Sequence, residues 1–259
     1  MPRWFFLDDG PMSGAMNMSR DEYLFKRVRE SHDQIILRTC SFDPPCISIG
    51  YHQEPENVLD MEAVSESGVD LVRRITGGRA LLHQQEFTYC IAASSESGVF
   101  ANRLGESFRQ VADLLINALS TLGVEASLSG GRRGGSGDGS TSPCLASVSR
   151  YEITAGGRKI VGSAQRRWGS VFLQHGSILL GGGSRRIGDF LPGDWTGLDR
   201  HITSVSEQAG FYPEYEILRD VLKGSFQRRV GAVFSELVLS ESERDEIDCA
   251  AAGKSLIIE

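Results

Sequence analysis

The chain has 259 residues, 40% of them hydrophobic, which is enough to bury a core and argues against extensive disorder. Its 27 Lys and Arg against 34 Asp and Glu give a formal charge of −7, which disfavours a basic nucleic-acid-binding protein. No apolar run approaches the roughly 18 residues of a membrane helix, and Asp8 and Asp9 interrupt the apolar start before it forms a signal-peptide core, so we expect a cytoplasmic protein without a membrane partner.

The cysteines form no recognisable framework. There are five, an odd number, and none is spaced Cys-x-x-Cys, so the sequence predicts neither a disulfide framework nor a zinc site, and no metal. Cys40, Cys46 and Cys90 stand in apolar, strand-like segments and are expected in the core. Any chemical role for a cysteine is then that of a single thiol.

The first half of the chain mixes helical and strand-like segments. Ser19 and Glu22 have the spacing of a capping box, which predicts a helix over 19–30. Apolar residues at helical spacing predict a second helix from Phe108 to Leu122, ended by Gly123. Short runs rich in Ile and Val predict strands at 34–40, 46–51, 70–75, 86–93 and 124–128.

The second half begins with a glycine-rich stretch. Six of the ten residues from Gly130 to Gly139 are glycine, which predicts a mobile surface loop over about 129–142 and not a domain boundary. Gly156-Gly157 is suited to the turn of a hairpin that places Lys159 across from Thr154. The remaining predicted segments are strands at 148–155, 158–164, 171–180 and 235–239, a helix over about 212–234, and an acidic helix starting near 240.

Strands and helices that are mixed without βα alternation indicate an α+β domain. We expect a mixed β-sheet with flanking helices in one domain over residues 1–259.

Three short segments carry the functional signal. The segment RRITGGRALLH (73–83) places two glycines after a strand, where their missing side chains let backbone amides approach a ligand. The second segment is GRKIVGSAQR (157–166), and LQHGSILL (173–180) follows it closely. Each segment is a weak signal by itself, but the three together, in this order, are specific.

Together these segments resemble the catalytic domain shared by lipoate-protein ligases, biotin protein ligases and octanoyltransferases. The resemblance starts at the Ser19 helix and covers the chain to Leu180, and we expect it to continue beyond. It implies that Gly77, Gly78 and Gly162-Ser163-Ala164 line an apolar acyl tunnel. It also implies that Arg74 and His83 lie near the mouth of this tunnel, and that His175-Gly176 is part of the binding site.

Within that superfamily the chain most resembles the cysteine-dependent octanoyltransferases of lipoate assembly. Ligases usually carry a third glycine where this chain has Arg79, and the larger residue disfavours a close approach to an adenylate phosphate. Cys144 stands fifteen positions before Lys159, as the nucleophile does in that octanoyltransferase group. Leu145 departs from the family's phenylalanine and concerns packing more than chemistry.

The pair Cys144 and Lys159 suits acyl transfer from a thioester. A free thiol with a pKa near 8.5 is only a few per cent ionised at neutral pH, so a nearby ammonium is needed to stabilise the thiolate. Lys159, once neutral, can take a proton from the incoming amine. The resemblance implies that octanoyl-acyl carrier protein is the donor, and that an apo lipoyl domain or glycine-cleavage H protein is the acceptor. No cofactor is expected.

Two rival functions remain open at the sequence level. In an ATP-dependent lipoate ligase Lys159 would hold an acyl-adenylate, Mg-ATP would be needed, and Cys144 would be incidental. A catalytically silent carrier-protein binder is the third hypothesis. His83 or His175 activating the thiol ranks below Lys159, because each histidine is equally well explained as a brace of the pocket floor.

Overall fold

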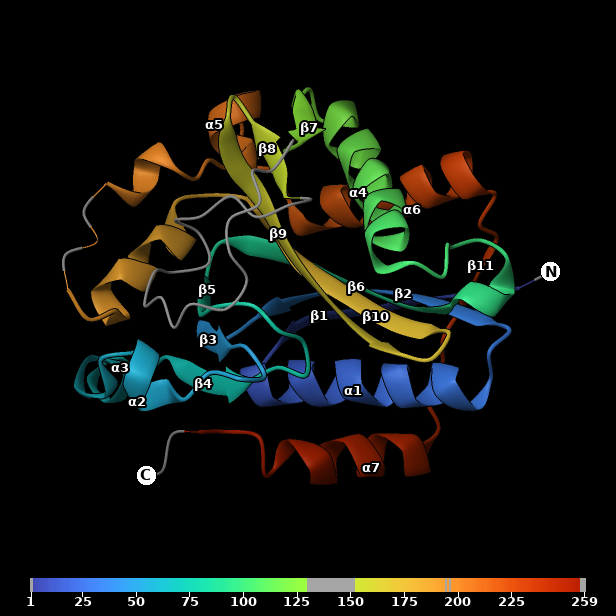
Figure 1. Cartoon of the computed structure of the whole chain (residues 1–259), viewed down its shortest axis with the longest axis horizontal. Helices are drawn as coiled ribbons and strands as arrows, with labels where there is room; N and C mark the ends of the chain where they lie inside the picture. Colours follow the sequence, from blue (N-terminus) through green and yellow to red (C-terminus); the bar gives the residue numbers. More distant parts are fainter. Residues whose placement is uncertain (1, 130–151, 194, 196, 257–259) are drawn as a thin grey trace.

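The computed structural model describes residues 2–129, 152–193, 195 and 197–256, and its largest element is an eight-stranded mixed sheet (Figure 1). The strands run in the order β11-β1-β2-β6-β10-β9-β8-β7. β1 is parallel to both of its neighbours, β11 and β2. All other neighbouring strands of this sheet, in the spatial order β2-β6-β10-β9-β8-β7, pair antiparallel. The strand bounds are β1 Arg3–Met12, β2 Gln34–Phe42, β6 Glu86–Ser94, β7 Ala126–Leu128, β8 Ile153–Ala155, β9 Arg158–Trp168, β10 Val171–Leu179 and β11 Phe234–Glu236.

A second, three-stranded sheet lies beside the first turns of helix α1 (Figure 1). Its order is β4-β3-β5, with β4 Asp70–Arg73, β3 Cys46–Ile49 and β5 Leu81–His83. The longer helices are α1 Gly14–Glu30, α4 Leu104–Thr121, α6 Tyr215–Val230 and α7 Glu241–Ala251. Shorter pieces are α2 Pro55–Val58, α3 Met61–Ser67, α5 Val205–Ala209 and 3₁₀ turns at Ser95–Ser97, Gly183–Phe190 and Leu198–Arg200.

The helices cover both faces of the large sheet, so its central strand β6 is buried along its whole length. Side chains alternate between the two faces of a strand. Phe87, Tyr89 and Ile91 therefore pack in one core with α4 and α6, whereas Cys90 and Ala92 pack in another with α1. α7 packs on the outer side of α1 (Figure 1). The predicted α+β class with a mixed sheet and flanking helices is confirmed.

The predicted start of the first helix is wrong. The helix begins at Gly14, and the Ser13 side chain caps it by accepting from the Met16 amide. Ser19 is instead buried inside the helix, so it cannot act as an N-cap. Hydrogen-bonding geometry at Ser13 thus outweighs the capping-box spacing at Ser19.

Strand β1 was not among the predicted elements, because Asp8 and Asp9 break its apolar pattern. Asp9 is nevertheless accommodated, since its carboxylate pairs with the buried guanidinium of Arg38 at 2.5 Å. The short elements β5, α2, α3 and α5 were not predicted either. The other differences lie mostly at boundaries: the predicted helix over 212–234 is α6, which ends at Val230, and β11 begins at Phe234. Of the predicted strand over 148–155, residues 153–155 form β8, while 148–151 and most of the predicted loop at 129–142 lie outside the described residues.

Candidate active site

A pocket that is open at its mouth lies between the two sheets and is closed on one side by α1. Most of its lining surface is apolar. It is lined by Met18, Phe42, Ser48, Arg74, Gly78, Leu81, His83, Thr88, Lys159, Gly162, Ser163, Ala164, His175, Gly176, Ser177 and Leu179. The register of β9 and β10 brings part of this set together, because Ala164 pairs with His175, Ser163 with Gly176, and Gly162 with Ser177.

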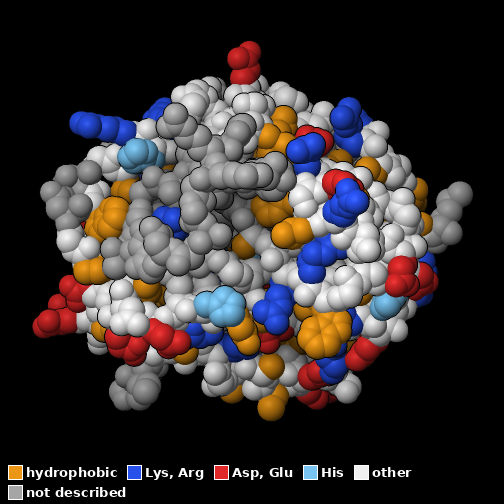
Figure 2. All heavy atoms as spheres, in the orientation of Figure 1, with side chains coloured by type: hydrophobic (Ala, Val, Ile, Leu, Met, Phe, Trp, Pro, Cys, Tyr) orange, Lys and Arg blue, Asp and Glu red, His pale blue; other side chains and the backbone are white. Residues whose placement is uncertain are grey.

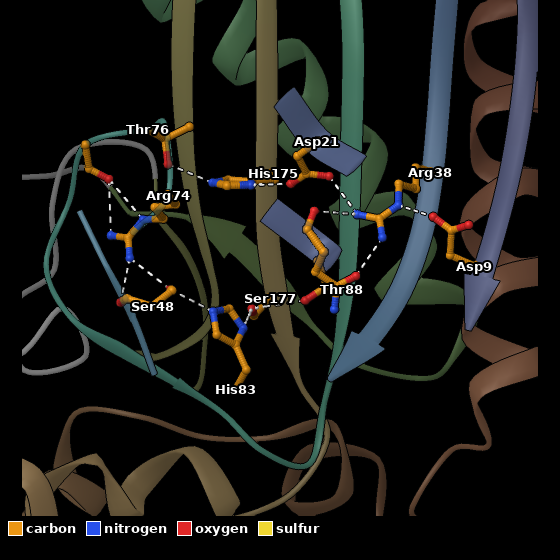
Figure 3. Close-up of polar contacts among 12 residues, drawn as sticks. Asp9, Asp21, Arg38, Ser48, Arg74, Thr76, His83, Thr88, His175 and Ser177 are labelled. Atoms are coloured by element: carbon orange, nitrogen blue, oxygen red, sulfur yellow. Dashed lines mark hydrogen bonds and ion pairs between the residues drawn. The ribbon is translucent and has the colours of Figure 1, made fainter. Parts of the chain in front are cut away.

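His175 belongs to a buried polar chain that crosses the sheet (Figure 3). Its Nδ1 donates to Asp21 Oδ2 at 2.7 Å, because a carboxylate can only accept, and its Nε2 lies 2.7 Å from Thr76 Oγ1. Asp21 in turn accepts from Arg38 Nη1 at 2.7 Å. Burial by itself raises the pKa of Asp21, but the charge of Arg38 and the hydrogen bond from His175 outweigh it and hold the pKa below 3.8. The imidazole ring is therefore fixed in orientation.

His83 and Arg74 share a second polar chain at the opposite wall (Figure 3). Arg74 Nη1 donates to Ser48 Oγ at 3.0 Å, and the same Oγ lies 2.8 Å from His83 Nε2. His83 Nδ1 lies 3.2 Å from Ser177 Oγ, and the ring stacks on Phe42 with centroids 4.0 Å apart. Both nitrogens of His83 are thus engaged by pocket hydroxyls.

Arg74 also fixes the glycine segment that follows β4. Its guanidinium donates to the carbonyl of Gly77 at 3.1 Å and to that of Arg79 at 2.8 Å. Gly78 has φ +103°, and a Cβ there would lie 2.7 Å from Arg74 Nη2. Gly77 is exposed and is not part of the pocket lining, so of the two predicted glycines only Gly78 lies at the pocket.

Lys159 is fully buried although it stands two residues after the hairpin turn. The predicted register is confirmed, with Lys159 across from Thr154. Its ammonium does not reach solvent but donates to Glu152 Oε1 at 2.6 Å, and its Nζ lies 3.4 Å from the position that a Cβ on Gly162 would take. The structure therefore places a buried ion pair at the wall of the pocket.

Cys144 lies outside the described residues, so the predicted approach of its thiol to Lys159 is not observed. The expectation for the core cysteines is confirmed: Cys40, Cys46 and Cys90 are buried, and burial raises the pKa of all three thiols. Such thiols are poor nucleophiles at neutral pH. Cys249 is the exposed thiol among the described residues.

Nine of the predicted site residues line one pocket: Arg74, Gly78, His83, Lys159, Gly162, Ser163, Ala164, His175 and Gly176. Sequence reasoning missed Glu152, Asp21 and Ser48, the polar partners of Lys159, His175 and His83. Glu152 carried a usable signal, since it stands two residues before Thr154, on the arm of the hairpin opposite Lys159. Asp21 and Ser48 come from α1 and β3, and only the folded chain brings them to the pocket.

Among the described residues no group of three or more His, Cys, Asp or Glu is placed to hold a metal ion. In the same part of the chain, no helix is both long and apolar enough to cross a membrane.

Residues 13–227 match the family described as the lipoyl protein ligase A/B catalytic domain. Octanoyltransferase LipM of Moorella thermoacetica is 44% identical over 177 residues, which are 68% of this chain and 65% of that protein. The chain thus matches slightly less than two thirds of the Moorella relative. Octanoyltransferase LipM of Symbiobacterium thermophilum is 32% identical over 262 residues, 97% of this chain and 95% of that protein.

Solved structures support the fold. A lipoate-protein ligase A bound with ATP superposes with a TM-score of 0.78 at 23% identity and covers 98% of this chain and 95% of its own. The bi-partite lipoate protein ligase of Thermoplasma acidophilum gives a TM-score of 0.78 at 20% identity, with 98% and 94% covered. The chain therefore belongs to the lipoyl protein ligase A/B catalytic domain family, as its three motifs predicted, and it is a homologue of octanoyltransferases over most of its length.

Proposed function

We propose that the protein moves an octanoyl group from acyl carrier protein to a lysine of a lipoyl domain or glycine-cleavage H protein, through a thioester on Cys144. The observation that carries the proposal is the buried Lys159 ammonium at the wall of a largely apolar pocket, in a chain whose relatives are octanoyltransferases. An apolar pocket suits a fatty acyl chain, and a buried cation suits the oxygen or sulfur anions of acyl transfer.

The chemistry balances without an external energy source. The Cys144 thiolate attacks the donor thioester, a new C–S bond forms as the bond to the carrier sulfur breaks, and the carrier thiolate leaves with the proton of the Lys159 ammonium, which leaves Lys159 neutral. The acceptor lysine, as a neutral amine, then attacks the acyl-cysteine, and the C–N bond of the amide forms while the Cys144 thiolate is released. The amine proton passes to a base in the pocket, for which Lys159 in its neutral form is our candidate.

The ion pair with Glu152 adds a condition to this role for Lys159. In the structure the ammonium donates to Glu152, and an ammonium suits stabilisation of a thiolate or an oxyanion but has no lone pair with which to abstract a proton. Glu152 follows Cys144 by only eight residues. A chain of that length spans at most about 28 Å, so the thiol and the ion pair are connected by a short segment.

The remaining predicted site residues have supporting roles in this proposal. Gly162, Ser163, Ala164 and Gly176 line the pocket in which we place the acyl chain. Gly176 also lets β10 pack closely on β9, since a Cβ there would meet the Gly162 carbonyl oxygen at 2.4 Å. His175 and His83 brace the walls through the hydrogen bonds described above, rather than exchanging protons with a thiol.

The experiment compares substrates and variants. Octanoyl-carrier protein and an apo lipoyl domain, without nucleotide, are expected to give octanoylated domain, and Cys144→Ala is expected to abolish the product while thermal unfolding stays unchanged. A ligase would instead need Mg-ATP and free octanoate or lipoate, and a silent binder would bind carrier protein without forming any product. A folded Cys144→Ala that keeps most of its activity would contradict the thioester route.

A further inference from the structure

A groove separate from the acyl pocket is formed by α1, α7 and the end of β9. Its walls carry two exposed aromatic rings, Tyr51 (46% exposed) and Trp168 (59% exposed). Each ring is covered by an arginine: the Arg166 guanidinium lies 4.8 Å from the centroid of Tyr51, and the Arg29 guanidinium lies 4.4 Å from that of Trp168. We call this pair of stacks, with the groove between them, the arginine–aromatic groove.

The charges of the groove are not balanced. Lys26 pairs with Glu246 at 2.5 Å, and Glu22 pairs with Lys254, so these four charges compensate one another. Within the described part of the chain neither Arg29 nor Arg166 forms an ion pair with a carboxylate. Figure 2 shows Lys and Arg side chains beside exposed hydrophobic ones on the face where the β9–β10 hairpin lies over α1.

The groove adjoins the acyl pocket. Ala164 lines the pocket and Arg166 lines the groove, and residues two apart on a strand point to the same face. The segment after β4 connects them as well, because Ile75 lines the groove and Gly78 lines the pocket. A molecule resting in the groove is therefore directed along β9 towards Lys159.

We propose that the arginine–aromatic groove is the docking surface for the carrier protein that delivers the acyl thioester, an inference that rests on the proposed function. The partner contributes a carboxylate-rich face, which two uncompensated arginines attract. The chain as a whole carries a charge of −7, so it repels an acidic partner everywhere except at such a local basic site, and this repulsion adds specificity. Stacked Arg, Trp and Tyr are also the residues that dominate binding energy at protein interfaces.

The distance to the acyl pocket favours the donor over the acceptor. Lys159 Nζ lies beside Gly162, four residues before Arg166 on β9, which corresponds to about 13 Å along the strand. The four-carbon stem of an acceptor lysine is much shorter than that. A carrier protein presents its thioester at the end of a long flexible arm, so it can rest on the groove and still place the acyl group in the pocket.

The test neutralises the two arginines together in Arg29→Gln/Arg166→Gln and uses Arg103→Gln, a largely exposed arginine on α4's N-terminal side, as the matched control. With the intact enzyme and octanoyl-carrier protein, we expect the double variant to raise the donor KM about tenfold with kcat nearly unchanged. Its KM for octanoyl-N-acetylcysteamine, which lacks the carrier, and its KM for the lipoyl domain should stay at the wild-type values.

A binding measurement separates this inference from the proposed function. Titration of carrier protein carrying a non-transferable octanoyl thioether, followed by Trp168 fluorescence, should show a Kd about tenfold weaker in the double variant and a shallower dependence on salt. Unchanged donor binding, or a raised KM for the lipoyl domain alone, would overturn the inference while leaving octanoyl transfer intact. If the wild-type protein transfers nothing without ATP, the function fails, and the binding titration still tests the groove.

Discussion

Lys159 and Glu152 show how strongly one residue pair is coupled inside the pocket. Two opposite charges are withdrawn from water there, and each makes the burial of the other tolerable. The cost of removing one partner is larger than the net contribution of the pair, because the buried charge left behind has lost both its hydration and this ion pair. We therefore expect the pair to link the stability of the pocket to the chemistry proposed for Lys159.

Glu152→Ala tests this coupling. We expect the free energy of unfolding to fall by about 3 kcal/mol, since the Lys159 ammonium is then buried without its carboxylate. Lys159→Met in the same background should restore part of that loss, because it removes the buried charge that has lost its ion pair with Glu152. Urea unfolding of wild type, both single variants and the double variant gives the coupling energy. Additive losses would show that the pair is not coupled.

Asp21 gives the fold a sensitivity to acid. Its pKa in the folded protein lies below 3.8, so the ionised carboxylate stabilises the fold above that pH, and the contribution is lost as the pH falls through the folded value. Asp21→Asn should be less stable than wild type at pH 7, and the difference should shrink between pH 5 and pH 3. Denaturant unfolding at these three pH values measures it. A difference that does not depend on pH would contradict the assignment.

At the scale of single elements, the segment between β4 and β5 depends on one glycine more than on its neighbour. Gly78 occupies the left-handed region at φ +103°, and Arg74 leaves no space for a Cβ there. Gly77 has open space around its Cβ position and no positive φ. The two adjacent glycines thus form a matched pair.

Gly78→Ala should lower the thermal stability and raise the donor KM, because the added methyl group must displace the Arg74 guanidinium from the Gly77 and Arg79 carbonyls. Gly77→Ala should change both quantities little. Calorimetry and initial rates on the two variants check this. Equal effects of the two substitutions would contradict this account, because they would show that backbone freedom at both glycines, rather than the contact of Gly78 with Arg74, determines stability and KM.

Elements with a strong repeating pattern were predictable, and those set by distant partners were not. Apolar residues at helical spacing located α4, and Gly156-Gly157 fixed the hairpin and the position of Lys159. Strand β1 was missed because its polar residues break the apolar pattern. The sequence alone does not show that Arg38 of the neighbouring strand compensates the charge of Asp9. The N-cap at Ser13 was missed for a different reason: a single serine is a weaker sequence signal for a helix start than the capping-box spacing of Ser19 and Glu22.

At the scale of the whole molecule, the pocket is assembled from segments far apart in the chain. Met18 comes from α1, Ser48 and His83 from the small sheet, and His175 from the large one. The resemblance of the sequence motifs to a known family identified the site residues of β9 and β10, which the structure shows to be neighbours in a hairpin. It could not identify Asp21 or Ser48, whose roles follow from the packing of α1 and β3 against that hairpin. The single domain expected over residues 1–259 stays a prediction.

The same assembly places the pocket beside the arginine–aromatic groove. The acyl pocket lies between the two sheets, and the arginine–aromatic groove continues from it across α1 towards α7. α7 is tied to α1 by ion pairs of Arg27 with Glu243 and of Lys26 with Glu246. The C-terminal helix therefore contributes to the wall of the proposed docking surface.

The most direct test of the account is to look for the acyl-enzyme itself. Cys249 is the exposed thiol among the described residues, and Cys249→Ser removes it as a second possible site of acylation. Incubating this variant with octanoyl-carrier protein alone should leave one hydroxylamine-labile octanoyl group, which peptide mass spectrometry locates on Cys144 and which added apo lipoyl domain discharges. If no adduct forms from the thioester, while free octanoate or lipoate with Mg-ATP yields modified domain, the protein is a ligase and the account of Cys144 is wrong.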